Sequence, residues 1–283
     1  NKGEWSEFYA FLKILSERRL YKADENLRPK KDDYHDVIGL THEDIGGAFR
    51  KYSYENDLIV VKNDKGSVLS TVELIEVSSK LKKILKTITE SDRTFNIPEA
   101  QDLMVRLHSR KISTNSKDKA DLQIRINDFR HNREVDMGYS VKSYIGSAPT
   151  LLNASPHTNF IFQIDNCKLT PESINRISTG KNWIFRRLEL IQNSGGTIRF
   201  VKIRSGQFAS NLQMIDTRFS ELLAQIMLEY YTTKNSSLED IAKTISKGAQ
   251  SDWDYHALEH KLGEFLCAIA LGMVPSKKLS WRT

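Results

Sequence analysis

The tightest constraint on the fold of this chain comes from residues 121–143, DLQIRINDFRHNREVDMGYSVKS, which have the pattern of two strands joined by a polar turn. In the first strand, Leu122, Ile124 and Ile126 alternate with polar residues, so their side chains point to one face of a sheet. The apolar run 159–164 can pair beside this hairpin. A β-sheet therefore lies at the centre of the predicted fold.

Helical patterns surround these strands. Residues 3–20 carry apolar side chains at helical spacing, residues 78–88 form a basic amphipathic helix, and Pro98 opens a further helix. Residues 58–77 have the pattern of a second hairpin, and from about residue 211 onward the chain is predicted to be helical. We therefore predict an α/β fold with a mixed central β-sheet flanked by helices.

The composition indicates the kind of partner and the environment. The formal net charge of +6 favours an anionic partner, most commonly nucleic acid, although a mildly basic enzyme would have the same charge. The cysteines, Cys167 and Cys267, lack metal-binding spacing and are expected to be reduced thiols in a cytoplasm. No apolar run approaches the roughly 20 residues that cross a bilayer, so no membrane partner is expected.

The hairpin combines an acid and a lysine, because Asp121 begins the first strand and Lys142 lies in the predicted second strand. Carboxylates are preferred Mg²⁺ ligands, and bound Mg²⁺ can support phosphodiester hydrolysis, with a lysine to orient or deprotonate the attacking water. Ser140, on the same predicted face as Lys142, stands where metal-dependent nucleases usually carry Asp or Glu. Acids and lysines are also common on solvated sheet faces, so spacing alone leaves both interpretations open.

Three long blocks give the chain a resemblance to the HpaII family of type II restriction endonucleases, which are similar to PD-(D/E)XK nucleases. The blocks are KGEWSE at Lys2–Glu7, GYSVKS at Gly138–Ser143 and GSAPTLLNAS at Gly146–Ser155. The resemblance is clear over residues 1–15 and 119–205. It implies a PD-(D/E)XK-like central sheet and Mg²⁺-dependent hydrolysis of double-stranded DNA.

The resemblance also implies roles for particular residues. Asp121 would ligate the metal and Lys142 would be the catalytic lysine, whereas Ser140 fills the position of the usual second acid. A KG-x-x-x-E pattern places a metal-binding glutamate on the first helix, which is Glu7 here, and Glu4 one turn away could substitute or assist. Acids near the start of a helix are also favourable without any metal. The expected catalytic set is Asp121, Lys142, Glu7 and Ser140, with Asp121, Glu7 and Glu4 as metal ligands.

Polar side chains in the hairpin turn and after the second strand are expected to bind DNA. Hydroxyl and amide groups can hydrogen-bond phosphates or base edges, and arginines can reach the DNA backbone. A polar loop with helix caps would account for some of the same residues without DNA. The expected DNA-binding residues are Arg130, Arg133, Ser143, Ser147, Thr150, Asn153 and Ser155.

Four parts are expected along the chain. Residues 1–20 form the N-terminal helix of the nuclease core, and residues 96–205 hold the core sheet and the active site. Residues 21–95, polar and irregular at their beginning, form an inserted α+β subdomain that could contact DNA. Residues 206–283 form a helical C-terminal region. Members of the family continue further, so the chain is expected to be a piece of a longer protein.

The activity implied by the resemblance is cleavage of double-stranded DNA at a short specific sequence, with CCGG as the expected target and 5′-phosphate ends. The expected setting is a bacterial cytoplasm that also contains a DNA methyltransferase of the same restriction system. Cutting a palindrome needs two active sites or one site that acts twice, so a monomer and a homodimer both remain open.

Two other functions stay open from the sequence. A relative that binds DNA without cutting it would keep the basic surface, and the serine at position 140 makes this conceivable. His256, Glu259 and His260 match H-x-x-E-H, a zinc-protease pattern in which two histidines one helical turn apart share Zn²⁺. That mechanism needs a further ligand downstream, and the apolar residues of this helix are spaced as a core stripe, so packing is the preferred explanation.

Overall fold

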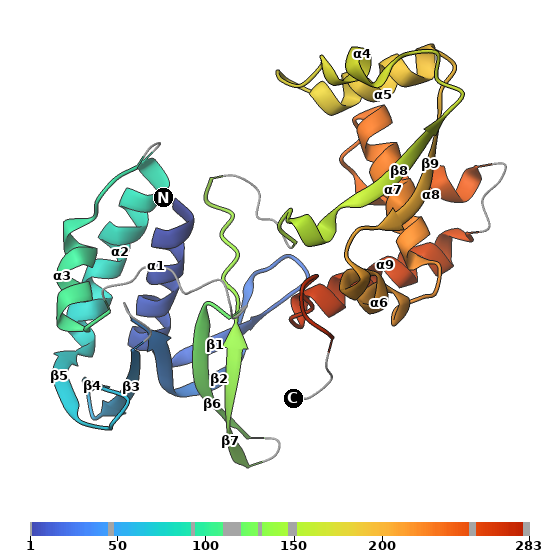
Figure 1. Ribbon diagram of the computed structural model, residues 1–283. Coiled ribbons are helices and arrows are strands. Elements are labelled where there is room, and N and C mark those ends of the chain that lie inside the picture. The colour runs from blue at the N-terminus through green and yellow to red at the C-terminus, as the bar shows by residue number, and fades with distance from the viewer. Residues whose placement is uncertain are drawn as a thin grey trace. The chain divides into compact units, whose positions relative to one another are not determined.

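The computed structural model describes residues 2–44, 48–91, 94–109, 120–129, 132–146, 152–248 and 253–279. The chain divides into two compact units, residues 1–150 and 151–283 (Figure 1). The described residues of each unit form a hydrophobic core of their own. The sequence predicted four parts with the core sheet reaching residue 205, so the observed division after residue 150 differs from that prediction.

The first unit is built on a seven-stranded sheet, and every strand pairing described in it is antiparallel. The strand order is β5-β4-β3-β2-β6-β7, and β1 also pairs with β2. The strands are β1 (Arg19–Ala23), β2 (Pro29–Glu43), β3 (Phe49–Glu55), β4 (Leu58–Lys62), β5 (Val68–Glu73), β6 (Leu122–Asp128) and β7 (Arg133–Tyr139). The predicted α/β fold with a central sheet and flanking helices is confirmed, although the described sheet is antiparallel rather than mixed.

Burial along β6 shows which face of this sheet is covered. Leu122, Ile124 and Ile126 are at most 4% exposed, whereas Gln123 and Arg125 between them are exposed. The buried face shares one core with the helices of the first unit (Figure 1). These helices are α1 (Lys2–Glu17), α2 (Leu74–Glu90) and α3 (Pro98–Arg106). The alternation that predicted the hairpin therefore also determined which side of it faces the core.

Residues 21–95 extend the same sheet, whereas the sequence predicted a separate subdomain there. The long strand β2 pairs with β6 on one side and with β3 on the other. Strand β2 includes residues that the sequence predicted to be irregular. Its buried apolar residues, Val37 and Leu40, lie only in its second half. The polar first half of β2 pairs with β1 and gives no apolar signal from which a strand could be predicted.

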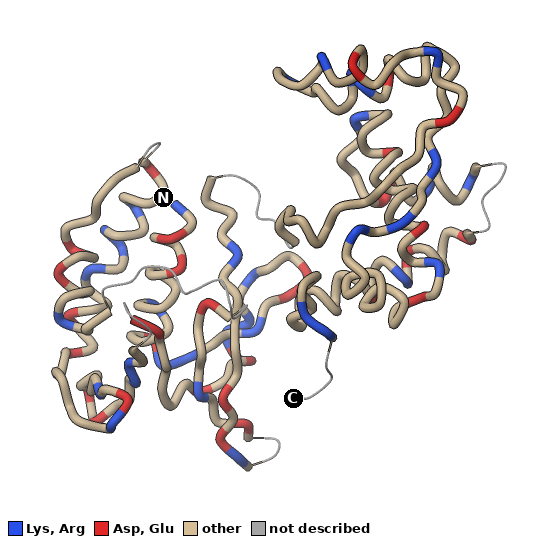
Figure 2. Tube along the Cα trace, viewed as in Figure 1, with Lys and Arg blue, Asp and Glu red and all other residues tan. Residues whose placement is uncertain are grey.

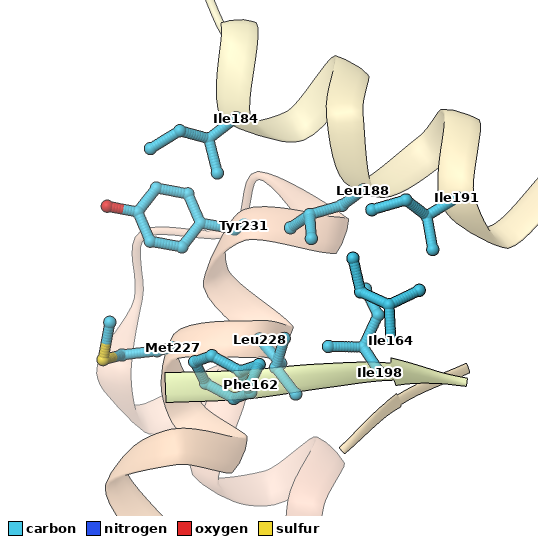
Figure 3. A pocket seen from close by; sticks show the side chains of 9 residues that line it. All are labelled: Phe162, Ile164, Ile184, Leu188, Ile191, Ile198, Met227, Leu228 and Tyr231. Carbon is cyan, nitrogen blue, oxygen red and sulfur yellow. The ribbon is translucent and has the colours of Figure 1, made fainter. Parts of the chain in front are cut away.

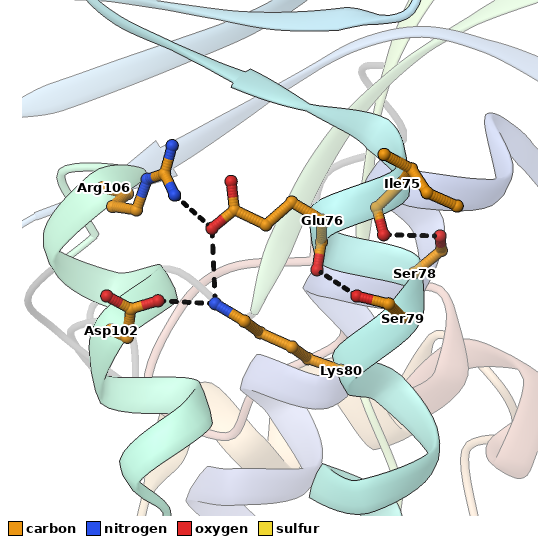
Figure 4. A network of polar contacts seen from close by, with 7 residues as sticks. All are labelled: Ile75, Glu76, Ser78, Ser79, Lys80, Asp102 and Arg106. Carbon is orange, nitrogen blue, oxygen red and sulfur yellow. Dashed lines mark hydrogen bonds and ion pairs between the residues drawn. The ribbon is translucent and has the colours of Figure 1, made fainter.

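Ionic contacts hold α2 against α3 (Figure 4). The Glu76 carboxylate accepts hydrogen bonds from Lys80, at 3.3 Å, and from Arg106, and Lys80 also pairs with Asp102. The Glu76 side chain is only 19% exposed, so these cations keep a largely buried charge paired. The contacts fix α3 on α2 within the helical layer that covers the sheet.

The second unit contains a two-stranded antiparallel sheet, in which β8 pairs with β9. The prediction that the run 159–164 pairs beside the hairpin is therefore wrong. The elements are β8 (Phe160–Asp165), β9 (Thr197–Ile203), α4 (Pro171–Asn175), α5 (Trp183–Asn193), α6 (Gly206–Gln213), α7 (Phe219–Thr233), α8 (Leu238–Lys247) and α9 (Tyr255–Ala270). In the described parts of the chain, no helix has the length and apolar character needed to cross a membrane.

Candidate active site

Asp121 lies immediately before β6 and is fixed to the segment that follows β7. Its backbone N–H donates to the Tyr139 carbonyl at 2.8 Å, and its carboxylate Oδ2 accepts from the Val141 backbone N–H at 2.6 Å. The carboxylate thus takes the place of a main-chain acceptor where the strand ladder stops. This contact holds Asp121 beside residues 140–142.

Ser140 and Lys142 lie beyond the end of β7, so their predicted location within the second strand is wrong. The last residue pair of the ladder joins Leu122 to Tyr139, which leaves no β6 residue to pair with the chain beyond it. The alternation of side chains nevertheless continues. Tyr139 and Val141 pack against the core, whereas Ser140 and Lys142 are exposed.

The N-terminal helix α1 brings a further acid to this region. Glu7 is half-buried, and its pKa is raised from 4.5 to about 7, first by burial and then by the negative charge of Asp121. The positive charge of Lys142 lowers this pKa, and the Glu4 carboxylate raises it further. A charge shifts the pKa of a carboxyl group in this way only when it is near that group. The structure therefore groups Asp121 and Lys142, which are distant in sequence, with Glu4 of the same helix around Glu7.

The side chains around Glu7 are of the chemical kind that binds a hard divalent cation. Carboxylate oxygens are preferred Mg²⁺ ligands, and a bound cation would neutralise the repulsion that Asp121 and Glu4 exert on Glu7. Within the described ranges, no three or more acidic, histidine or cysteine side chains lie close enough together to hold a metal ion as they stand. The assignment of metal ligands is thus a proposal, supported by the charges that meet at Glu7.

The chain from residue 143 to 146 runs past the beginning of α1. Ser143 Oγ accepts a hydrogen bond from the Ile145 backbone N–H at 3.1 Å, so this hydroxyl stabilises its own turn. Gly146 has a φ of +107°, and a Cβ added there would lie 3.4 Å from Lys2 Cδ. Lys2 in turn donates to the Thr89 carbonyl at 3.1 Å. The KGEWSE block and the start of the GSAPTLLNAS block are therefore neighbours in space.

The structure describes some of the remaining residues that were predicted to bind DNA. Arg133 is exposed at the start of β7. Asn153 is exposed, whereas Ser155 caps the short 3₁₀ helix Pro156–Thr158 by accepting from the His157 backbone N–H at 3.2 Å. This cap gives Ser155 the structural role that the sequence allowed as an alternative. Arg130, Ser147 and Thr150 lie outside the described residues.

Asp136, a further acid of the hairpin, pairs with Arg125 across the two strands. On the exposed face of the sheet, Arg125 donates to both carboxylate oxygens of Asp136, each at 2.8 Å. The guanidinium also lowers the pKa of Asp136. Sequence reasoning missed this pair and the bond from Val141 to Asp121. The direct cross-strand position of Arg125 and Asp136 is a signal that the hairpin register would have supplied.

The H-x-x-E-H pattern lies on α9 with its histidines directed to solvent. The His256 and His260 side chains are 86% and 72% exposed. Their ring nitrogens lie 4.0 Å from the Glu259 carboxylate and 3.7 Å from the Glu264 carboxylate, respectively. The same helix buries Leu258 completely. This geometry favours a solvated helix face opposite a packed one, rather than a zinc site.

Gly138→Ala is expected to disturb the chain at Asp121 through its neighbour Ala120. A Cβ at position 138 would lie 2.8 Å from the Ala120 Cβ, closer than two carbon atoms approach without displacement. We expect the free energy of unfolding in urea to fall by about 1–3 kcal/mol. Gly206→Ala is the control, because a Cβ there would meet nothing within 4 Å. Equal losses for the two variants would contradict the proposed clash.

Comparisons with known proteins bear on the whole chain. The model of the HpaII restriction endonuclease family matches residues 1–282. The type II restriction enzyme HpaII of Haemophilus parainfluenzae is 32% identical over 288 residues, which cover 97% of this chain and 77% of the relative. No solved structure gives a significant match.

Proposed function

This chain belongs to the HpaII restriction endonuclease family, and we propose that it cuts double-stranded DNA in a Mg²⁺-dependent reaction at a short specific sequence, with CCGG as the expected target. The family predicted from the three sequence blocks is confirmed, and with it the class of the enzyme, a type II site-specific deoxyribonuclease. The proposed target sequence comes from the family resemblance alone. The fold cannot supply it, since the residues that read bases vary among proteins with one fold.

The meeting of Asp121, Lys142 and Glu7 carries the proposed mechanism. The carboxylates of Asp121 and Glu7, assisted by Glu4, would hold Mg²⁺, which when bound supplies Lewis-acid stabilisation of the phosphate charge. Ser140 contributes no carboxylate, so Glu7 on α1 takes over the part of the second acid. The Val141 backbone N–H, which donates to Asp121 Oδ2, holds this carboxylate beside residues 140–142 and leaves Oδ1 as a further oxygen for the cation.

Lys142 acts on the water and on the phosphate in this proposal. Its exposed side chain can reach a bound phosphodiester, orient the attacking water and stabilise the developing negative charge on the phosphate oxygens. The water oxygen forms a bond to phosphorus as the bond from phosphorus to the 3′ oxygen breaks. The products are a 3′-hydroxyl and a 5′-phosphate.

The proposed biological setting is restriction in a bacterial cytoplasm. A DNA methyltransferase of matching specificity would protect the host sites, since an unprotected genome would be cut at every target. Two strands must be cut at each target, either by two copies of the chain or by one copy that acts twice.

Digestion of plasmid DNA with purified protein and Mg²⁺ tests the proposal. Discrete fragments that disappear on addition of a chelator are expected from the wild-type chain. Asp121→Ala is expected to lower the cleavage rate at least about 100-fold, because it removes a proposed metal ligand. Unchanged cutting by this variant would refute the metal site, and DNA binding without any cutting by the wild-type chain would favour a non-catalytic DNA-binding relative.

A further inference from the structure

The β8–β9 ribbon of the second unit has one face that packs on helices and one exposed face that carries most of its polar side chains. Phe162, Ile164 and Ile198 point toward α5 and α7 and line an apolar pocket of about 220 Å³ with them (Figure 3). Side chains alternate along a strand, so their neighbours point the other way. Gln163 and Arg199, which are paired in register, lie on this opposite face and are exposed. The helices therefore support the ribbon from behind and leave its polar face accessible in the described chain.

The polar side chains of this exposed face are Gln163, Asp165, Arg199 and Lys202, and we call them the polar ribbon face. Ile161, which pairs with Lys202, and Val201 are exposed beside them. Cations predominate among the charged side chains. Lys and Arg positions recur along β9 (Figure 2). Arg199 and Lys202 are exposed, and exposed Arg204 directly follows the strand. Asp165 is the acid among these residues, and its side chain is 35% exposed. The charged groups of this surface are net positive, which complements a polyanion, and the exposed Ile161 and Val201 add apolar contact area beside them.

A chain of hydrogen bonds orients three side chains of this face. An Arg199 NH2 group donates to Gln163 Oε1 at 2.9 Å, and Gln163 Nε2 donates to Asp165 Oδ1 at 2.6 Å. Arg199 Nε also lies 3.7 Å from Asp165 Oδ2, while the Arg199 side chain remains 60% exposed. A guanidinium has five N–H donors, so several stay available. The ribbon presents these donors beside a carboxylate acceptor in one fixed arrangement.

We propose that the polar ribbon face enters the major groove of DNA and that Arg199, Gln163 and Asp165 read base edges there. This inference rests on the proposed function, because cleavage at a specific sequence requires contacts that distinguish bases. The major groove of B-DNA is about 12 Å wide and admits a two-stranded β-ribbon. Lys202 and Arg204 then lie along the ribbon as contacts for phosphates, which fix its position on the duplex.

The arrangement of donor and acceptor on the polar ribbon face selects a particular base pair. Guanine offers two acceptors in the major groove that match the fork of an arginine, and cytosine offers an amino group that a carboxylate accepts. Arg199 beside Asp165 is therefore complementary to a G·C pair. Gln163 holds both side chains at the spacing observed and adds a further donor. The ribbon is expected to read a G·C pair within the target.

The test compares Arg199→Ala, Arg199→Lys and the control Arg176→Ala in the full chain. Arg176 is an exposed arginine at the end of α4, outside the ribbon strands. Each protein is incubated with two short duplexes. One contains CCGG, and the other has one G·C pair of that site replaced. Arg199→Ala is expected to lower kcat/KM on the target roughly 10- to 100-fold and to reduce discrimination against the altered duplex. Arg199→Lys keeps the charge but loses the fork, so a similar loss is expected, whereas Arg176→Ala cuts like wild type.

Each other outcome has a distinct meaning. Unchanged cleavage by Arg199→Ala overturns the ribbon contact while the proposed function stands. A uniform loss on both duplexes that Arg199→Lys restores makes Arg199 a phosphate contact and overturns base reading. If the wild-type chain cuts no DNA, the proposed function fails. Fluorescence anisotropy with the same duplexes then decides the ribbon contact, because equal affinities of wild type and Arg199→Ala overturn it. Thermal unfolding confirms that all variants are folded.

Discussion

Lys142→Ala is expected to lower the rate of DNA cleavage by about 10³- to 10⁴-fold while the protein still binds DNA. The lysine lies on the extended segment after β7, where Asp121 holds the chain through the Val141 backbone N–H. Its charge reaches Glu7, so its loss removes the cation from a group of three acids. In the proposed mechanism the attacking water then loses its orienting group, and the phosphate loses a cation that would stabilise its charge.

The matched control for Lys142→Ala is Lys65→Ala, in the turn between β4 and β5. Both lysines are exposed, so both variants should unfold at the wild-type temperature within about 1–2 °C, as is usual for surface substitutions. Single-turnover cleavage of a labelled duplex measures the rate, and anisotropy measures binding. A Lys142→Ala enzyme that cuts at more than a tenth of the wild-type rate would remove Lys142 from the catalytic set.

The hairpin at the site was the part of the fold most open to prediction, because its pattern is local. Alternation along residues 122–126 determined both the strand and its buried face, and β6 and β7 pair in an unbroken register. The end of β7 was not predictable in the same way. Tyr139 is its last residue because the Asp121 side chain takes the next available backbone N–H, and a period of two says nothing about such a bond.

Pairings between distant strands were the part that the sequence left undetermined. The apolar pattern of residues 159–164 is the same whether this strand pairs with β7 or with β9. It pairs with β9, and both strands pack against α5 and α7. The polar first half of β2 is a strand only because β1 pairs with it. Glu7 shows the same limit at the site. The family resemblance selected it, but the physical reason, the charges of Asp121 and Lys142 beside it, appears only in three dimensions.

The metal-free protein is expected to lose stability between pH 5 and pH 8 because of Glu7. Its pKa is raised from 4.5 to about 7 in the folded state, chiefly by burial and by the charge of Asp121. The folded state therefore binds this proton more tightly than the unfolded state. The resulting stabilisation is fully present below pH 4.5 and is lost as the pH rises through 7. Because the group is only half-buried, the change in unfolding free energy is expected to be on the order of 1 kcal/mol.

Glu7→Gln is expected to remove this pH dependence and to lower DNA cleavage by about 10³-fold, equivalent to several kcal/mol of lost charge stabilisation. Urea unfolding of the wild-type and variant proteins, each with a chelator, measures the first effect. The control is Glu55→Gln at the exposed end of β3, which should leave both the pH dependence and the cleavage rate unchanged.

Addition of Mg²⁺ separates a metal ligand from a merely buried acid. At pH 8 Glu7 is mostly ionised, so a cation that binds it should raise the unfolding temperature of the wild-type protein. Bound cation should also offset most of the stability that the ionisation of Glu7 removes. Glu7→Gln should respond far less, and Glu4→Gln should lie between the two, since Glu4 acts on Glu7 as the weaker neighbouring acid. If Glu4→Gln abolished the response and Glu7→Gln retained it, the ligand would be Glu4, and the raised pKa of Glu7 would then reflect only its burial and its acidic neighbours.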